Sequence, residues 1–568
     1  MLPQSPDPCL SLAEAVAVSV VSFLAWIVVC GYAADRLGMP MAPAAIVPLS
    51  IGATAAACVR MRRRVEWGAR DAVALVVASG AVLAWLLWLA WPALLPPGRG
   101  PDLAHHLLLI DYIERHWRLV HEASVEIYLG QMVHYTPGFH IVAAIAGAWT
   151  RTDGLRVVYP LIACAVALKI GFVFLIALRV LPRDLARMPF ALAAVLLLLL
   201  PRAYLVGSFT HDSFFAQVVS ETFAVAMWWA VVVWDERRPV ERNSRPWPGA
   251  MAVFALAGAA AFLTWPVWVG PPVLMLVAVV LAREGLPTSR RVAHLALAVG
   301  PIAAVAVVYA AGRVAHVGLV SISAGVPRPA ASDFGWLFLA TSALGLVIAA
   351  RHRFARATAL LLVALALQAA TLYALAKRSG ADTPYMALKM IYLAIYPLAV
   401  VAALALAAAW QAVIRTGGER SWSARLRGAT GERVAWALLV IFGVAVARQV
   451  TVVRRPKPVI TRRLSLAGQW ARTHVEPTCV DYLVADSDAA YWLHLAVLGN
   501  RWMSTRTADP ATFDPHAALV RWIEPRSLPF AIADVGVAPK LVLSDAEVLA
   551  DFGQAVVIRR RGESVCPD

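Results

Sequence analysis

The segment 96–136 concentrates titratable side chains in an otherwise apolar chain, with five acidic residues and five histidines. Pro101 favours the start of a helix, which places Asp102 in the first helical turn, where a negative charge is stabilised. His106 follows one turn later on the same face, and His105 is the i+3 neighbour. Asp102 therefore has imidazole partners and lies just beyond the outer end of a predicted span. For most residues of the segment we expect an amphipathic helix lying on the membrane, with Leu107, Leu108, Ile110 and Ile113 facing lipid; Asp102 is the exception.

A second group of polar residues is His211 and Asp212 in the loop 207–216, with Glu221 just inside the next apolar segment. Two carboxylates and a histidine can bind a divalent cation or a substrate hydroxyl. Asp212 is equally suited to be a helix cap.

Cations near the expected outer surface form a third group. Arg202 interrupts an apolar run, and Lys389 lies at the start of another. Cations inside a membrane are costly and usually face the protein interior, a cavity or a partner. An anionic lipid phosphate is a plausible partner for both. Contact with ordinary lipid phosphates is the alternative, favoured for Lys377 and Arg378. Lys169, in the middle of an apolar segment, belongs either to an ion pair or to a transport pathway.

These residues are carried by a chain that is too apolar to be soluble. Of its 568 residues 60% are apolar and 15% are charged, with a mean hydropathy of +0.68, whereas soluble domains have about 45–50% and about 25%. This composition excludes a soluble enzyme, a disordered chain and a disulfide-rich secreted module. The net charge of +16 does not indicate nucleic-acid binding, because the excess lies beside apolar segments, where it sets membrane orientation. Nucleotide-binding GxxxxGK[ST], metalloprotease HExxH and CxxC motifs are absent from the sequence.

Segments of about 20 apolar residues predict membrane-spanning helices. Thirteen are predicted, near 10–33, 41–59, 71–95, 157–178, 190–206, 217–234, 249–264, 267–282, 293–311, 334–350, 357–376, 388–410 and 434–450. Arginine is enriched in alternate loops, which predicts a cytoplasmic N-terminus and an extracytoplasmic C-terminus, in a bacterial inner membrane. The segment 137–150 is too short to span and is expected to be a re-entrant or interfacial helix on the outer side. No cleavable signal is expected.

The tail differs from the rest of the chain. We predict that residues 1–450 form the membrane domain, with 96–136 as its large first outer loop, and that 451–568 form a small extracytoplasmic α/β domain. Strand-like runs occupy 480–485, 531–535, 540–543 and 555–559. Cys479 and Cys566 both lie in this domain, in a compartment that permits disulfides. They form either a disulfide or two unpaired thiols. The expected fold class is therefore mainly α and polytopic, with about 13 spanning helices and one re-entrant or interfacial helix.

The sequence resembles the GT-C superfamily of polytopic glycosyltransferases, which includes protein mannosyltransferases and aminoarabinose transferases of lipid A. The resemblance is carried by short motifs within a shared layout: Gly100-Pro101-Asp102, His105-His106, Tyr135-Thr136-Pro137-Gly138-Phe139-His140, Gln469-Trp470-Ala471, Asp486 and Gly499-Asn500-Arg501. The Trp-Trp-Asp signature of oligosaccharyltransferases is missing, and so is a paired acidic motif in the first loop. The resemblance therefore favours the branch that transfers single sugars.

The resemblance implies a polyprenyl-phosphate sugar as donor and an acceptor hydroxyl that attacks the anomeric carbon in a single inverting displacement. Asp102 becomes the candidate base, while His105 and His106 would tune it or bind the acceptor. Arg202 and Lys389 would hold the departing phosphate, and His211 with Asp212 would complete a divalent-cation site if one is used. Membrane lipids are the expected surroundings. Two alternatives remain: a transporter or flippase with a pathway around Lys169, and a non-catalytic scaffold of envelope assembly.

Overall fold

A computed structural model describes residues 10–62, 65–66, 68–92, 94–96, 101–121, 129–182, 185–236, 248–311, 329–416, 429–451, 461–485, 487–497, 515–524, 527–538, 543–564 and 566. Its helical bundle contains α1 (Leu12–Arg36), α2 (Pro43–Arg62), α3 (Ala69–Leu89), α4 (Pro101–His116), α6 (Gly138–Thr150), α7 (Gly154–Val180), α8 (Arg187–Leu198), α9 (Arg202–Leu205), α10 (Gly207–Thr210), α11 (Phe215–Glu236), α12 (Pro248–Thr264), α13 (Gly270–Leu281), α14 (Thr288–Ala310), α15 (Trp336–Arg351), α16 (Arg356–Arg378), α17 (Tyr385–Thr416) and α19 (Ala429–Thr451). Short 3-10 helices join several of them: η2 (Gly130–His134), η3 (Pro266–Trp268), η5 (Ala331–Asp333) and η6 (Arg353–Ala355).

The chain is a polytopic membrane protein, as its composition predicts. Each of the thirteen predicted segments coincides with a helix, and within the part of the chain that the structure describes eight of these helices are long and apolar enough to cross a membrane. The 23-residue α19 is not among the eight. Helices satisfy their own backbone hydrogen bonds, which a lipid surrounding requires. The exact number of spans stays a prediction, because α8, α12, α13 and α15 are shorter.

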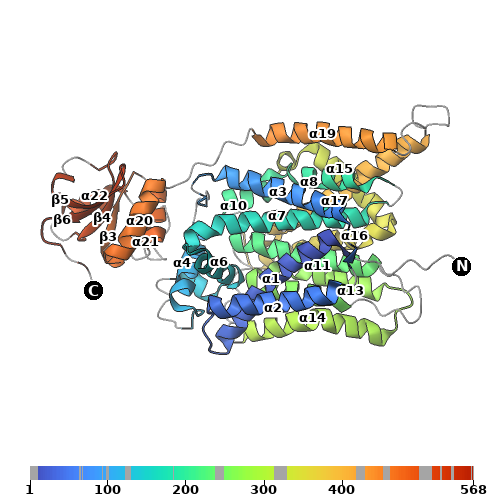
Figure 1. The fold of residues 1–568 in the computed structure, drawn as a ribbon, viewed down its shortest axis with the longest axis horizontal. Coiled ribbons are helices and arrows are strands. Elements are labelled where there is room, and N and C mark those ends of the chain that lie inside the picture. The colour runs from blue at the N-terminus through green and yellow to red at the C-terminus, as the bar shows by residue number, and fades with distance from the viewer. Residues whose placement is uncertain are drawn as a thin grey trace.

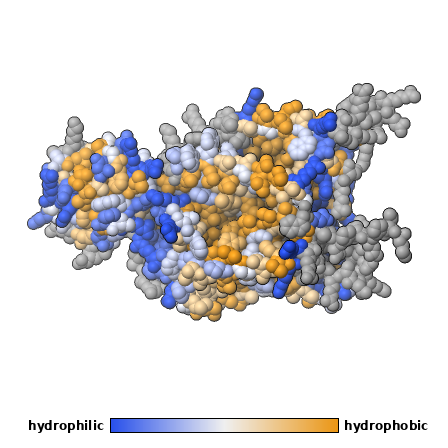
Figure 2. Space-filling view, viewed as in Figure 1, coloured by the Kyte–Doolittle hydropathy of each residue, from blue (hydrophilic) through white to orange (hydrophobic). Residues whose placement is uncertain are grey.

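The centre of the bundle is α11, which is buried along nearly its whole length. It packs mainly against α12 and α7. Helices at the periphery, such as α2 and α14, expose apolar side chains. Figure 2 shows hydrophobic residues over the middle of the bundle and hydrophilic residues over the C-terminal domain and the adjoining end of the bundle. This surface fits a belt of lipid around the helices.

At the end of the bundle nearest the C-terminal domain, α4 and α6 pack against each other (Figure 1). Leu107, Leu108, Ile110 and Ile113 of α4 are buried in the protein, so the expectation that they face lipid is wrong. α6 has 13 residues and is about 20 Å long. That length is too short for a bilayer core of about 30 Å, in agreement with the prediction for 137–150.

A buried carboxylate holds the chain that follows α4 against α1. Asp35, at the end of α1, accepts hydrogen bonds from the backbone N–H of Leu119 at 2.8 Å and from Nε2 of His121 at 3.0 Å. The chain that leaves α4 is thereby held against the first helix.

The C-terminal domain contains α20 (Arg462–His474), η7 (Pro477–Cys479), α21 (Ser487–Val497) and α22 (Pro515–Ile523) around a four-stranded sheet. The strands β3 (Val480–Leu483), β4 (Phe530–Asp534), β5 (Ala546–Asp551) and β6 (Ala555–Arg560) lie in the order β3-β4-β6-β5. β3 and β4 are parallel, with Val480 opposite Phe530, and the other pairs are antiparallel. A short parallel pair, β1 (Leu10–Ser11) with β2 (Val65–Glu66), lies in the bundle.

Three of the predicted strand-like runs coincide with β3, β4 and β6. The fourth, 540–543, is wrong where it can be checked: Leu543 is not in a strand, and the strand of this region begins at Ala546. Residues 540–542 lie outside the described part of the chain.

The structure pairs Cys479 with Cys566 in a disulfide whose Cα atoms are 5.3 Å apart. The predicted domain boundary lies between residues 450 and 451. Residues 452–460, directly after it, lie outside the described part of the chain.

The C-terminal domain contacts the bundle through α20. Arg472 forms an ion pair with the buried carboxylate of Asp111 on α4, which also contacts Arg115 at 2.9 Å. Gln469 donates to Asp153, the N-cap of α7, at 3.2 Å and accepts from Arg156. The domain is therefore attached to α4 by an ion pair and to the start of α7 by hydrogen bonds.

Candidate functional site

Asp102 lies in the first turn of α4, as the sequence predicts for a helix that begins at Pro101. The structure does not describe the side chain of Asp102, so the place of its carboxylate stays a prediction. The next turn carries His105, which is partly buried, and His106, which is buried.

His106 forms a pair with a second buried histidine. Its Nδ1 lies 3.0 Å from Nε2 of His140, the third residue of α6. One ring donates the proton and the other accepts it, since the contact is a hydrogen bond between two imidazoles. The rings of Tyr135, Phe139 and Phe215 surround His106 at centroid distances of 5.5–5.8 Å. The pair is thus enclosed by aromatic side chains from α6, α11 and the segment before α6.

Lys389 belongs to the same region. Its ammonium nitrogen lies 3.6 Å from the ring centroid of Phe214, 4.5 Å from that of Tyr385 and 4.9 Å from that of Trp265. The residue is 3% exposed. Aromatic faces attract cations, most strongly where water is excluded. Lys389, predicted from the sequence to hold a phosphate, is therefore a buried positive charge with a largely aromatic environment.

The electrostatics of this cluster keep the histidines neutral. Burial lowers the pKa of His106 well below its usual value, and nearby His140, His105 and Lys389 lower it further. Because a neutral imidazole donates at one nitrogen and accepts at the other, His106 can bind hydroxyl groups as well as relay a proton. Lys389 is then the positive charge of this cluster.

His211 and Asp212 lie beside this cluster. Nδ1 of His211 is 2.7 Å from Oδ1 of Asp212, and the Tyr392 hydroxyl donates to Oδ2 of Asp212 at 3.1 Å. Tyr392 in turn packs edge-on against Phe214, one of the rings around Lys389. The structure therefore brings His105, His106, His211, Asp212 and Lys389 to one end of the bundle, on α4, the 207–216 loop and α17.

The loop before α11 carries a residue with an unusual backbone conformation. Ser213 has a φ of +57°, is fully buried, and its hydroxyl has no hydrogen-bond partner among the residues that the structure describes. A positive φ outside glycine is costly and is often found at functional sites. Arg202, at the start of the four-residue α9, is half-buried in the preceding segment, and it is not one of the residues whose rings lie around Lys389.

Glu221 does not join the His211–Asp212 pair. It forms a fully buried ion pair with Lys169, accepts from the Tyr396 hydroxyl at 2.8 Å and from Gln217 at 3.2 Å. Within the described ranges of the chain, no group of three or more His, Cys, Asp or Glu residues is arranged to hold a metal ion. His211 and Asp212 alone thus do not make a complete cation site, and the divalent cation stays a prediction.

A carboxyl group with a raised pKa, that of Glu114, lies in the last turn of α4. Burial and the neighbouring Asp153 raise the pKa of Glu114 to about 8, against the opposing effects of the Gly154 N–H and Arg115. Glu114 lies where α4 meets α6 and α7, because its Oε1 would be 2.8 Å from a Cβ on Gly147 and 3.4 Å from one on Gly154. It therefore titrates near neutral pH at the junction that also receives the C-terminal domain.

Several residues of the cluster were not identified as site residues from the sequence. The sequence marks His140 only as part of a motif, and no pattern in it distinguishes Tyr392, Phe214 or Trp265 as site residues. Aromatic residues are common at membrane interfaces. Their types alone therefore did not distinguish these rings from structural ones. Only the convergence of α6, α11 and α17 in space reveals them.

Neither the protein-family models nor the curated proteins contain a match to this chain. Among solved structures, ArnT from Cupriavidus metallidurans bound to undecaprenyl phosphate has 15% sequence identity and a TM-score of 0.46, with 85% of this chain and 97% of that chain covered. The apo oligosaccharyltransferase of Archaeoglobus fulgidus has 14% identity and a TM-score of 0.47, with 82% and 70% covered. At these identities and TM-scores the likeness transfers neither a family nor a residue role to this chain.

Proposed function

We propose that the chain is a membrane glycosyltransferase that moves a sugar from a polyprenyl-phosphate donor to an acceptor hydroxyl on the extracytoplasmic side. The observation that carries this proposal is the convergence of Lys389 with the His106–His140 pair, one turn after Asp102, at the end of the bundle that bears the C-terminal domain. A buried cation beside neutral hydroxyl-binding groups suits a substrate with a phosphate and a sugar.

Lys389 is the proposed phosphate ligand. A departing polyprenyl phosphate gains negative charge as the bond to the sugar breaks, and a fixed cation in a water-poor site stabilises that charge. The rings of Phe214, Tyr385 and Trp265 exclude water around the ammonium group. Arg202 is proposed as a second ligand of the same phosphate on the strength of the sequence alone.

Asp102 is the proposed general base. The acceptor oxygen forms a bond to the anomeric carbon while the bond from that carbon to the phosphate oxygen breaks. The hydroxyl proton passes to the Asp102 carboxylate, and the phosphate leaves as the free polyprenyl phosphate anion. Attack from the face opposite the leaving group inverts the anomeric configuration. His105 and His106 would orient the acceptor hydroxyl, since neutral imidazoles both donate and accept.

The transporter alternative places the pathway around Lys169. Lys169 is fully buried in its ion pair with Glu221, with Tyr396 and Gln217 completing the contacts of the carboxylate. A closed pair of this kind favours a structural role and supports the transferase proposal over the transporter.

The test is sugar transfer by the purified full chain in nanodiscs, with undecaprenyl-phosphate glucose, mannose and aminoarabinose as donors. Release of undecaprenyl phosphate and loss of the donor are measured. Asp102→Asn should reduce the release at least 100-fold, in line with the usual contribution of a general base of about 10²–10⁴, and leave the melting temperature unchanged. Lys389→Met should raise the KM for the donor.

Asp382→Asn is the matched control, because Asp382 is an exposed carboxylate at the same end of the bundle, between α16 and α17. It should retain full transfer. Unimpaired transfer by the Asp102→Asn protein would remove Asp102 from the mechanism. Accumulation of an intact donor on the other side of a proteoliposome, with no undecaprenyl phosphate released, would identify a flippase instead.

A further inference from the structure

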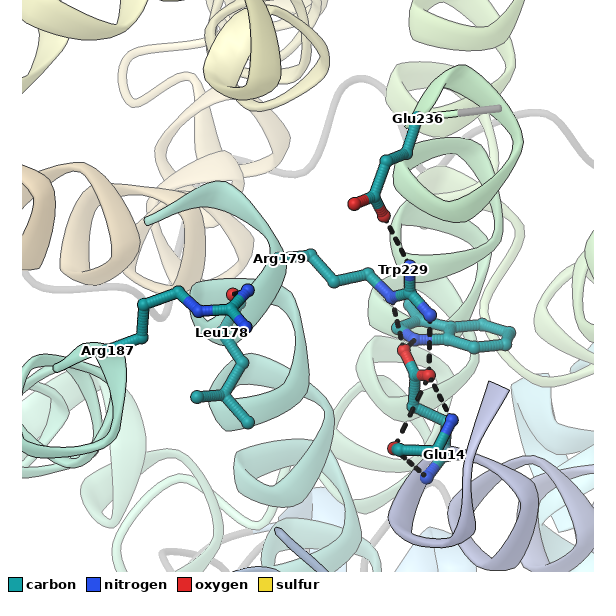
Figure 3. A network of polar contacts seen from close by, with 7 residues as sticks. Glu14, Leu178, Arg179, Arg187, Trp229 and Glu236 are labelled. Atoms are coloured by element: carbon teal, nitrogen blue, oxygen red, sulfur yellow. Dashed lines mark hydrogen bonds and ion pairs between the residues drawn. The ribbon is translucent and has the colours of Figure 1, made fainter. Parts of the chain in front are cut away.

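Some buried polar groups of the bundle satisfy one another completely. At the far end of α7, a network of this kind joins α1, α7 and α11 (Figure 3). All three guanidinium nitrogens of Arg179 donate to Glu14 or Glu236, and the Trp229 indole N–H donates to Glu14 at 3.1 Å. Because its donors meet acceptors within the network, this arrangement supports the helices and needs no ligand.

The His106–His140 pair is different, because one of its nitrogens stays open. Nδ1 of His106 lies 3.0 Å from Nε2 of His140. His140 is fully buried, whereas His106 is 4% exposed. Among the described residues Nε2 of His106 has no hydrogen-bond partner, yet it is not one of the enclosed polar atoms that lack one. This nitrogen is therefore the one that a ligand can reach.

The backbone beside His140 determines which of its nitrogens carries the proton. Burial lowers the pKa of His140 to about 3, so its ring is neutral, and the carbonyls of Thr136 and Pro137 oppose that shift. They oppose it because they face a ring nitrogen, which must be Nδ1, since Nε2 is turned to His106. A carbonyl oxygen attracts an N–H and repels a lone pair. His140 therefore has its proton on Nδ1, although no hydrogen bond of regular geometry forms there among the described residues.

The proton position of His140 determines that of His106. With its proton on Nδ1, His140 offers only a lone pair at Nε2, so the contact between the rings requires the proton of His106 to be on Nδ1. Burial, followed by the effects of His140, His105 and Lys389, lowers the pKa of His106 well below its usual value, so this ring also carries a single proton. Nε2 of His106 is then a bare hydrogen-bond acceptor.

The surroundings of His106 indicate which group donates to that acceptor. The ring of Tyr135 lies 5.5 Å from that of His106 and 5.9 Å from that of Trp265, and Lys389 lies 4.9 Å from the centroid of Trp265. His106 and the proposed phosphate ligand Lys389 are thus separated by a short chain of rings. In a polyprenyl-phosphate donor the sugar is bonded directly to the phosphate, so a phosphate at Lys389 places sugar hydroxyls near His106.

The attacking hydroxyl of the acceptor does not fit this position. Its proton passes to Asp102 in the proposed transfer, and a bare nitrogen has no proton to donate to its oxygen. A hydroxyl of the donor sugar has its proton free and meets the requirement.

We propose that His140 is a positioning residue, which holds the proton of His106 on Nδ1 so that Nε2 of His106 accepts a hydrogen bond from a hydroxyl of the donor sugar. The inference rests on the proposed function and makes the role of His106 in it specific. Orientation of the acceptor hydroxyl is then left to His105.

The first test determines the proton positions without any sugar transfer. Solid-state NMR of the full chain in nanodiscs, with isotope-labelled histidine, distinguishes a protonated ring nitrogen from a bare one. The His106 signals are identified by their loss in His106→Asn. We expect a proton on Nδ1 and a bare Nε2. A sugar donor that the chain uses should shift the Nε2 signal toward that of a hydrogen-bonded nitrogen, whereas undecaprenyl phosphate, which lacks the sugar, should not.

The second test measures the binding of the donor and of undecaprenyl phosphate to variants of His140. His140→Leu removes the acceptor for Nδ1 of His106 and should weaken donor binding about fivefold, the usual effect of one lost hydrogen bond. Binding of undecaprenyl phosphate should stay unchanged. His140→Gln keeps an oxygen that accepts from His106 and an N–H for the carbonyls, so it should restore donor binding to within about twofold.

Trp229→Phe is the structural control, because it removes one hydrogen bond from the network around Arg179. It should lower the melting temperature and leave the His106 signals and donor binding unchanged. A proton on Nε2 of His106 in the unmodified chain would overturn the proposal. Equal weakening of donor and undecaprenyl phosphate in His140→Leu would overturn it as well. Absence of transfer from every donor, with Nε2 bare, would contradict the proposed function and leave the positioning role of His140 standing.

Discussion

The buried pair of Lys169 and Glu221 allows a prediction whose size can be worked out from its contacts. Lys169→Met leaves the Glu221 carboxylate charged inside the bundle with only the Tyr396 hydroxyl and the Gln217 amide as donors. Removal of one partner of a buried ion pair usually costs about 3–5 kcal/mol. Glu221→Gln should cost a similar amount, because it leaves the Lys169 ammonium group without a counter-charge.

The double variant should be far milder than the two single variants combined. Without either charge no ion remains to be desolvated, and the glutamine keeps an oxygen that accepts from Tyr396. The expected cost is about 1 kcal/mol for the weakened hydrogen bonds. The coupling free energy between the two sites should therefore be at least about 5 kcal/mol, above the scatter of about 0.5 kcal/mol for independent sites.

The assay is unfolding of the purified chain in mixed micelles by sodium dodecyl sulfate, followed by tryptophan fluorescence, for the three variants and the unmodified chain. Lys377→Met serves as the control lysine: Lys377, near the end of α16, donates hydrogen bonds to the backbone carbonyls of Ala381 and Asp382. Its loss should cost below about 1 kcal/mol. Additive effects of Lys169→Met and Glu221→Gln would refute the ion-pair reasoning, and unchanged stability with lost transport would instead indicate a pathway.

Two other predictions concern the C-terminal domain and the end of the bundle that it contacts. Because the pKa of Glu114 rises from an ordinary 4.5 to about 8 on folding, the folded state binds the proton more tightly and stability should fall as the pH rises from about 4.5 through about 8. Glu114→Gln should flatten that part of the melting-temperature profile; an unchanged profile would contradict the burial of this carboxyl group. Reduction of the Cys479–Cys566 disulfide, which closes a loop with a sequence separation of 87, should destabilise the C-terminal domain by about 4–5 kcal/mol. Full labelling of both thiols without reductant would show that the bridge does not form.

The membrane part of the fold could be predicted because length and apolarity are sufficient signals for helices in lipid. The start of α4 at Pro101 was also predictable, since proline and an acidic residue mark a helix N-terminus. The burial of Leu107 and Ile110 was not, because an apolar side chain is equally compatible with lipid and with a protein interior. The sequence alone does not state which of the two it faces.

The polar contacts were the least predictable part. Lys169 finds its partner Glu221 on a different helix, 52 residues away, and no local spacing relates the two. The same holds for His106 with His140, which are 34 residues apart. In the C-terminal domain β5 was missed because its edge position leaves residues such as Glu547 and Val548 exposed. It therefore lacks the run of apolar residues with which β4 and β6 begin.

The ion pair between Arg472 and Asp111 joins α20 to α4, a helix that is synthesised much earlier. During synthesis α4 leaves the ribosome long before α20, since chains are made from the N-terminus. About 350 further residues must be synthesised after α4 before its partner Arg472 on α20 is present. A nascent chain that has not yet reached α20 therefore lacks this ion pair, and α4 is then held only by its packing against α6 and by the contacts of the chain that follows it.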